Sequence, residues 1–215
     1  MASFVSGSRS IAIDEHEPAN GSACPAIVLL HGSGGTIGFW ADRFAPQVTA
    51  QGVALYCVHY FDRTGTRRAD AATILDGVHY PQWLETVGDA LRYVRARPRV
   101  DASRVALLGI SLGAFLALSA AADGANRVRA VVEISGGMPE AYAPEVTAAF
   151  PPTLILHGDA DTVVPVAQAQ ALDALLTRAG VRHRTEILEG QGHWFDGGAQ
   201  VRILMATAEF LRTNL

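Results

Sequence analysis

The stretch Arg104-Val105-Ala106-Leu107-Leu108-Gly109-Ile110-Ser111-Leu112-Gly113 decides the fold of this 215-residue chain. Its first five residues form a mostly apolar run typical of a buried strand, and the apolar residues after Gly113 are typical of a helix packed on a sheet. Between them lies a G-x-S-x-G pattern, which predicts a strand-to-helix turn tight enough to push a serine hydroxyl above the sheet. Glycine two residues before and two after Ser111 avoids collisions with the neighbouring strand and helix. We therefore predict a nucleophile elbow at Ser111, with an ordinary strand-to-helix turn as the alternative.

The rest of the chain repeats this alternation of short apolar runs and longer segments of helical period. The runs lie at residues 26–30, 53–59, 104–108, 128–134, 153–156 and 184–188. Near-continuous apolar runs of this length suit parallel strands that are buried on both faces. A further strand near residues 11–13 is expected to pair antiparallel at one edge. The sequence therefore predicts an α/β fold with a mostly parallel central sheet covered by helices on both faces.

Apolar residues at helical spacing predict three of the helices. They are Trp83, Leu84, Val87, Leu91 and Val94 in the first, Leu172, Leu175 and Leu176 in the second, and Val201, Leu204, Ala208 and Leu211 in the last. Pro98 follows the first helix, while Pro165 begins the second and Gly180 ends it. No repeat, low-complexity tract or linker is visible, so residues 1–215 are expected to form one domain.

Composition excludes several classes of protein. Apolar residues make up 49% of the chain and charged residues 18%, the reverse of the balance in disordered proteins. The densest apolar stretch, residues 114–122, is far shorter than the roughly 18 residues that a membrane-spanning helix needs. A formal net charge of −4 without a basic stripe argues against nucleic-acid binding. Cys24 and Cys57 have no metal-binding spacing and are too few for a disulfide scaffold. The first ten residues lack a signal-peptide pattern, so a cytoplasmic location is expected. The expected oligomeric state is a monomer or a homodimer.

Two carboxylates follow the run at residues 153–156, in His157-Gly158-Asp159-Ala160-Asp161. Either could be a helix cap, because aspartate near a helix start is stabilising. Asp161 has room for a turn that aims its carboxylate inward, so we favour it as the group that orients a catalytic histidine. Asp159, nearer the strand, is expected to shape the turn.

A histidine follows the last run, in Gly190-Gln191-Gly192-His193-Trp194-Phe195. A glycine-flanked loop leaves His193 free to lie over the end of the sheet, where a general base must be. Most single histidines in a chain with seven are surface or structural residues. His193, however, is third in the chain order Ser…Asp…His of a known catalytic triad. The sequence therefore predicts the triad Ser111, Asp161 and His193.

The first strong strand ends in a glycine-rich loop, His31-Gly32-Ser33-Gly34-Gly35-Thr36. Acyl transfer needs two backbone N–H donors aimed at the developing oxyanion. We expect them to be the N–H groups of Leu112 and Ser33. A phosphate-binding loop is the alternative, but the loop lacks both G-K-[ST] and a full G-x-G-x-x-G.

These strand ends resemble the α/β-hydrolase superfamily over nearly the whole chain, and the small size without a cap domain is most similar to the dienelactone hydrolase family. The resemblance implies ester hydrolysis without a metal or cofactor. Three departures matter. The founding enzymes of that family use cysteine where this chain has Ser111. A glutamate beside their oxyanion loop is replaced by Gly32 or its neighbour. Their carboxylate-binding arginines match no positions here, which puts dienelactone itself in doubt as a substrate.

The predicted function is therefore hydrolysis of a small-molecule carboxylic ester through an acyl-enzyme. Only residues 136–151 separate two strands, too few for a helical lid, so a small or open site is expected. Tyr60, Arg63 and Trp194 are candidate substrate contacts, although Arg63 with Arg67 and Arg68 also fits a solvated basic loop. Trp194 and Phe195 could equally pack against the last helix. The alternatives are an acyl thioesterase, a peptidase-like acyl hydrolase, or a non-catalytic binding protein on the same scaffold.

Overall fold

The computed structural model describes residues 2–19 and 23–215, without the side chains of residues 39, 40 and 43. Eight strands form one sheet in the order β1-β2-β4-β3-β5-β6-β7-β8. The strands are β1 (Ala2–Ser6), β2 (Arg9–His16), β3 (Cys24–Leu30), β4 (Ala54–Val58), β5 (Val100–Ile110), β6 (Val131–Ile134), β7 (Thr153–Gly158) and β8 (His183–Leu188). The α-helices are α1 (Gly38–Ala50), α2 (Ala71–Leu75), α3 (His79–Arg95), α4 (Leu112–Ala122), α5 (Ala167–Ala179) and α6 (Gly197–Asn214), with 3₁₀ turns η1 (Tyr60–Arg63), η2 (Gly124–Asn126) and η3 (Glu140–Glu145).

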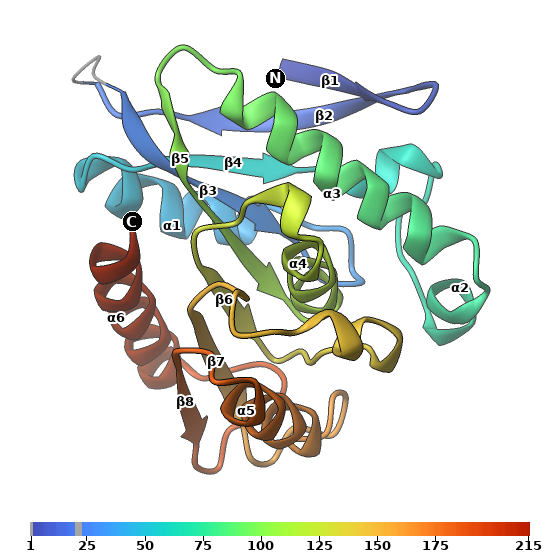
Figure 1. Cartoon of the computed structure of the whole chain (residues 1–215), viewed down its shortest axis with the longest axis vertical. Coiled ribbons are helices and arrows are strands. Elements are labelled where there is room, and N and C mark those ends of the chain that lie inside the picture. The colour runs from blue at the N-terminus through green and yellow to red at the C-terminus, as the bar shows by residue number, and fades with distance from the viewer. Residues whose placement is uncertain (1, 20–22) are drawn as a thin grey trace.

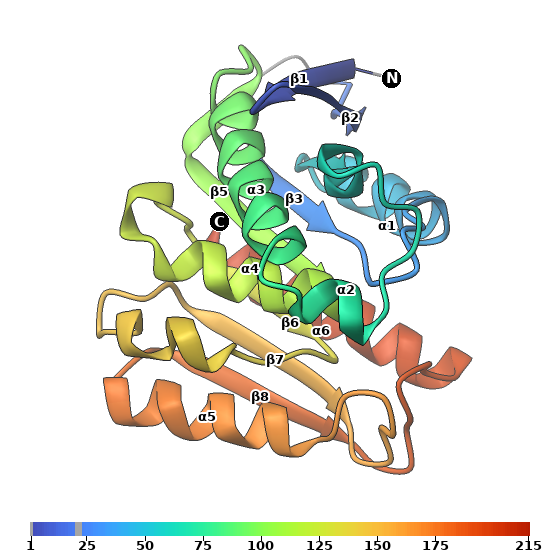
Figure 2. The ribbon, with the colours of Figure 1, turned by 90° about the vertical axis from the view of Figure 1, so that its right-hand side faces the viewer.

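Helices cover both faces of the sheet. The view in Figure 1 places α1 and α6 on one side and α3, α4 and α5 on the other, and Figure 2 looks onto the second side. Each face has its own hydrophobic core, because alternate residues of the central strands point to opposite faces: Val131 packs toward α4, whereas Val132 packs toward α6. The predicted architecture, a mostly parallel sheet covered on both faces, is confirmed.

The parallel part of the sheet follows the apolar runs read from the sequence. Strands β3 to β8 pair in parallel, and β2 pairs antiparallel with β4, as the edge strand near residues 11–13 was expected to do. Strand β1 was not predicted from the sequence; it pairs antiparallel with β2 at the sheet edge. Only alternate residues of β1 are buried, with Phe4 inside and Val5 71% exposed, so it lacks a continuous apolar run.

Two of the three predicted helices have the expected buried face. In α3, Trp83, Val87, Leu91 and Val94 are fully buried, and in α5 Leu172 and Leu176 are buried while Leu175 is partly buried. The face predicted for the last helix is wrong in part. Leu211 is buried as expected and Leu204 is partly buried, but Val201 is 57% exposed. Ile203 and Phe210, which the predicted face did not include, also face the sheet.

The connections at the carboxyl ends of the strands are short. Between β6 and β7 there is one 3₁₀ turn, η3, and no cap domain, as expected. None of the described helices is both long and apolar enough to cross a membrane. Cys24 and Cys57 are buried free thiols, and burial raises the pKa of Cys57 to about 12.

Candidate active site

Ser111 lies on a strained turn between β5 and α4. Its φ of 54° and ψ of −120° are unusual for a residue with a side chain, and such strain is characteristic of nucleophile elbows. A Cβ on Gly109 would lie 2.2 Å from the Gly113 carbonyl oxygen, and a Cβ on Gly113 would lie 2.2 Å from the Leu30 carbonyl oxygen. Both glycines are therefore required by close backbone approach, as the sequence indicated.

The three residues predicted as a triad meet at the carboxyl end of the sheet. The Ser111 hydroxyl lies 3.0 Å from His193 Nε2, and His193 Nδ1 lies 2.7 Å from Asp161 Oδ2. Because the Asp161 carboxylate only accepts, Nδ1 carries the proton and Nε2 is free to accept from Ser111. The imidazole side chain is 6% exposed and the Asp161 side chain is fully buried. This geometry suits a serine activated by a histidine base.

Asp161 is held ionised by its hydrogen bonds. Burial opposes ionisation, but hydrogen bonds from His193 and from the Val164 and Val163 amides outweigh it and hold the pKa of Asp161 below its usual range. Its Oδ1 accepts from Val163 N at 2.8 Å and Val164 N at 2.9 Å, which leaves Oδ2 for His193. The turn thus fixes the direction of the carboxylate.

Asp159, which was expected to shape its own turn, contacts a different loop. Its Oδ1 accepts from Gly190 N at 2.7 Å, so it ties the loop after β7 to the loop that carries His193. The Ala160 amide adds a second link by donating to the Gln191 carbonyl oxygen. The loops that present the base and its partner are therefore joined.

The loop after β3 approaches Ser111 closely enough to provide an oxyanion hole. A Cβ on Gly32 would lie 3.3 Å from Ser111 Cβ, so glycine permits this approach. Ser33 and Leu112 both line the pocket in front of Ser111. Within residues 2–19 and 23–215, neither of their backbone N–H groups donates in a described hydrogen bond. These amides are thus available to an oxyanion.

Tyr60 supports that loop from below. It is fully buried, its hydroxyl donates to the His31 carbonyl oxygen at 2.7 Å, and its ring stacks on the His31 ring at 4.1 Å. Burial lowers the pKa of His31 to about 4, so this imidazole is neutral near pH 7. The expected substrate contact of Tyr60 is wrong for this structure, because the side chain has no exposed surface.

Arg63 and Trp194 also lie outside the pocket lining. Arg63 forms an ion pair with Glu85 at 3.0 Å and its guanidinium lies against Gly7 at the β1–β2 turn, away from Ser111. Trp194 is 79% exposed, and its ring meets the His193 ring edge-on. Phe195 is buried against α6, the packing alternative considered above.

A pocket of about 780 Å³ opens in front of Ser111. Its walls come from chain connections and from parts of α2, α3 and α4. Much of the apolar surface is supplied by Ala69, Ile74, Leu75, Tyr80, Phe115, Met138, Pro139, Tyr142 and Val164. The site is open, as expected, but not small, since this volume lies well within the range of about 300–1,000 Å³ for ligand sites. These wall residues were not predicted from the sequence, because no strand motif marks them.

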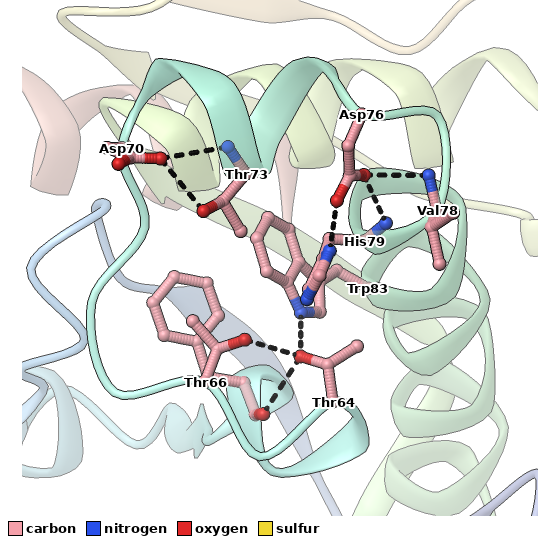
Figure 3. Close-up of polar contacts among 9 residues, drawn as sticks. Thr64, Thr66, Asp70, Thr73, Asp76, Val78, His79 and Trp83 are labelled. Atoms are coloured by element: carbon pink, nitrogen blue, oxygen red, sulfur yellow. Dashed lines mark hydrogen bonds and ion pairs between the residues drawn. The ribbon is translucent and has the colours of Figure 1, made fainter.

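One wall of the pocket is the short helix α2 with its flanking turns. Asp70 caps the start of α2 by accepting from Thr73 N at 2.8 Å (Figure 3). Asp76, at the C-terminal end of α2, accepts from Val78 N and His79 N in the turn that leads into α3. Below them, Trp83 Nε1 donates to Thr64 at 2.9 Å. Because α2 has no buried residue, hydrogen bonds from side chains to backbone amides stabilise this wall.

The sheet order, the elbow and the Ser-His-Asp contacts define an α/β hydrolase. The chain belongs to the dienelactone hydrolase family, whose model matches residues 15–201.

Curated relatives share part of this sequence, and solved structures share its fold. The chain is 27% identical over 183 residues to Esterase YpfH of Escherichia coli, covering 79% of this chain and 76% of that protein. It is 32% identical over 119 residues to the quorum-quenching protein AidA of Acinetobacter baumannii, covering 54% of this chain but only 37% of AidA. The dienelactone hydrolase-like promiscuous phosphotriesterase P91, from metagenomic libraries, has a TM-score of 0.83 at 21% identity, covering 99% of this chain and 96% of P91. Esterase 2 of Thermogutta terrifontis has a TM-score of 0.75 at 19% identity, covering 95% of this chain and 89% of the esterase.

Proposed function

We propose that this protein is a serine hydrolase that cleaves carboxylic esters through an acyl-enzyme. The observation that carries the proposal is the continuous contact from Ser111 Oγ through the His193 imidazole to the Asp161 carboxylate. The residues Leu112 and Ser33, whose backbone amides donate in no hydrogen bond among the described residues, line the same pocket as this serine. A nucleophile, a base, an orienting carboxylate and oxyanion donors are together the parts that acyl transfer requires.

In the proposed reaction, His193 Nε2 takes the Ser111 proton as Oγ attacks the ester carbonyl. Asp161 stabilises the imidazolium and holds its orientation. The oxyanion accepts hydrogen bonds from the N–H groups of Leu112 and Ser33. His193 then protonates the leaving alcohol, and a water molecule, activated by the same base, releases the acid from Ser111.

The relatives support ester hydrolysis over the other acyl transfers. YpfH is named as an esterase, and the Thermogutta enzyme has been captured with butyrate and phosphorylated by paraoxon. An acyl thioesterase and a peptidase-like hydrolase use the same machinery and stay as alternatives. Parallel assays with matched oxygen esters, thioesters and anilides separate the three.

Replacing His193 with asparagine should abolish covalent labelling of Ser111. A fluorophosphonate or paraoxon reacts with an activated serine, and activation needs the base at Nε2. Intact-protein mass spectrometry should show one adduct per chain on the wild type and none on H193N under the same conditions. Equal labelling of both proteins would remove His193 from the proposed mechanism.

The pocket lining favours uncharged substrates. Its lining includes two carboxylates, Asp70 and Glu140, and no arginine or lysine among the described residues. An acidic substituent on the substrate would meet like charge and no cationic partner. We therefore propose neutral esters as substrates and expect poor turnover of lactones that carry a carboxylate.

A matched pair of substrates tests this charge preference. 4-Nitrophenyl butyrate should exceed mono(4-nitrophenyl) glutarate in kcat/KM by about tenfold or more at low salt, and Glu140→Gln should narrow the ratio by about two- to threefold. Glu145→Gln is the control, because Glu145 shares η3 but does not line this pocket. Equal rates for the two esters would refute the proposed preference.

A further inference from the structure

An ionisable residue lies in the middle of the sheet, one strand away from the nucleophile. Glu133 on β6 is fully buried, and its neighbours in register are Gly109 on β5 and Ile155 on β7. Its Oε2 accepts from Gly136 N at 2.8 Å, and its Oε1 has no hydrogen-bond partner within the described residues. Such a residue is costly unless it is neutral or has a role that the fold requires.

The hydrogen bond of Glu133 fixes the turn that lies behind the elbow. Gly136 packs so closely that a Cβ there would lie 2.4 Å from Ala114 Cβ and 3.3 Å from the Ser111 carbonyl oxygen. The preceding residue, Ser135, has a φ of 55°, a conformation that must be held by its surroundings. Glu133 and the Ser135 amide, which donates to the Leu156 carbonyl oxygen, supply two of those restraints.

The same turn begins one wall of the substrate pocket. A Cβ on Gly137 would lie 2.8 Å from the Gln168 side chain and 3.3 Å from the Phe115 ring. Phe115, Gln168 and the next residue, Met138, all line the pocket. The position of the turn therefore affects both the back of Ser111 and the surface that the substrate contacts.

The surroundings of Glu133 favour its neutral form. Gly109, Ile155 and Ala114 offer no positive charge from β5, β7 or α4. The next side chain on the same face of β7 is His157, which lies opposite Ser135 in the register. His157 Nε2 donates to the Val164 carbonyl oxygen at 2.8 Å and lies 3.4 Å from the Asp161 carboxylate, so its buried Nδ1 is an unprotonated acceptor. The lone pair of His157 Nδ1 and the ionised Asp161 carboxylate both disfavour a negative charge on Glu133.

We propose that Glu133 is a positioning residue: as a neutral carboxylic acid it holds the Ser135–Gly136–Gly137 turn against the elbow, and so fixes Ser111 and the pocket wall that starts at Met138. Burial raises the pKa of Glu133 to about 8, an effect that the Gly136 hydrogen bond only partly offsets. Above that pH the acid ionises. A buried negative charge beside Ser111 then opposes formation of the anionic tetrahedral intermediate.

Activity against pH is the first test, and it rests on the proposed esterase function. Wild-type kcat/KM for 4-nitrophenyl butyrate should fall as pH rises through about 8, whereas Glu133→Gln should keep its activity there. At pH 7, the kcat/KM of E133Q should stay within about threefold of the wild-type value, because the amide oxygen of the glutamine still accepts from Gly136 N. Glu133→Met, which has no acceptor, should lose about tenfold or more in kcat. The proposal would be overturned if kcat/KM decreased equally above pH 8 in wild type and E133Q. It would also be overturned if E133Q and E133M lost kcat equally at pH 7.

Stability against pH is the second test and needs no activity. The unfolded glutamate releases its proton near 4.5 but the folded one near 8, so between these values the folded state binds more protons. The free energy of unfolding therefore falls across this window and is level above it. E133Q cannot titrate, so its Tm relative to wild type should rise from pH 5 to pH 9. Glu145→Gln, an exposed carboxylate replaced in the same way, should give no such rise.

The two measurements separate the failures. Parallel Tm curves for wild type and E133Q would show that Glu133 is not held neutral, whatever the enzyme does. Absence of ester turnover in every variant, with the Tm difference present, would instead refute the proposed function and leave the neutral Glu133 in place. E133Q decides both tests even if E133M does not fold.

Discussion

Replacing Ser111 with alanine should lower kcat/KM for 4-nitrophenyl butyrate by about 10⁴-fold or more. The alanine variant has no group that can form the acyl-enzyme, and the loss of one hydroxyl at a partly exposed turn should leave the fold intact. The same variant should show no adduct with a fluorophosphonate by mass spectrometry.

The control for this variant is Ser103→Ala, which removes a hydroxyl from an exposed position on β5, the strand that precedes Ser111. Circular dichroism and Tm should be close to wild type for both proteins. If S111A retained its esterase activity, Ser111 would not be the nucleophile.

Replacing Asp161 with asparagine should lower kcat by about 10³–10⁴-fold, in line with the loss of a triad aspartate in other serine hydrolases. The asparagine can turn an N–H toward His193 Nδ1, which favours the tautomer whose Nε2 carries a proton and cannot accept from Ser111. The KM should change much less than kcat, since Asp161 does not line the pocket.

Asp159→Asn is the matched control for D161N. The two residues lie two positions apart in one turn, and the amide oxygen of the introduced asparagine can still accept from Gly190 N as Asp159 does. The kcat of D159N should stay within about fivefold of the wild-type value. Equal losses in D159N and D161N would mean that the turn needs both carboxylates for its shape and would remove the special role of Asp161.

The residues brought together at the site were predictable because each follows a strand. Ser111, Asp161 and His193 follow the carboxyl ends of β5, β7 and β8, and parallel strands bring those ends to one edge of the sheet. The sheet itself followed from the same runs. The weakly patterned edge strand β1 did not, because half of its residues face solvent.

Residues whose role depends on contacts between distant segments were not predictable. Tyr60 follows a strand just as Ser111 does, but the stacked His31 ring and the His31 carbonyl oxygen bury it. The walls around the pocket come from connections without apolar runs. Glu133 did leave a signal, a charge within the apolar run at residues 128–134, but its meaning depends on the Gly136 amide, which only the folded turn brings within reach.

The α2 wall has a consequence for how this enzyme type can diversify. The reacting groups stand on strand ends that are tied into the core, whereas α2 has no buried residue among its five and packs against the core through the partly buried Ile74. Asp70 and Asp76 fix its two ends by hydrogen bonds to backbone amides. Insertions, deletions and substitutions in residues 71–75 therefore act on selectivity while the reaction stays the same. We expect this segment to change readily during evolution. A library of variants confined to residues 71–75 should yield new substrate preferences without loss of folding.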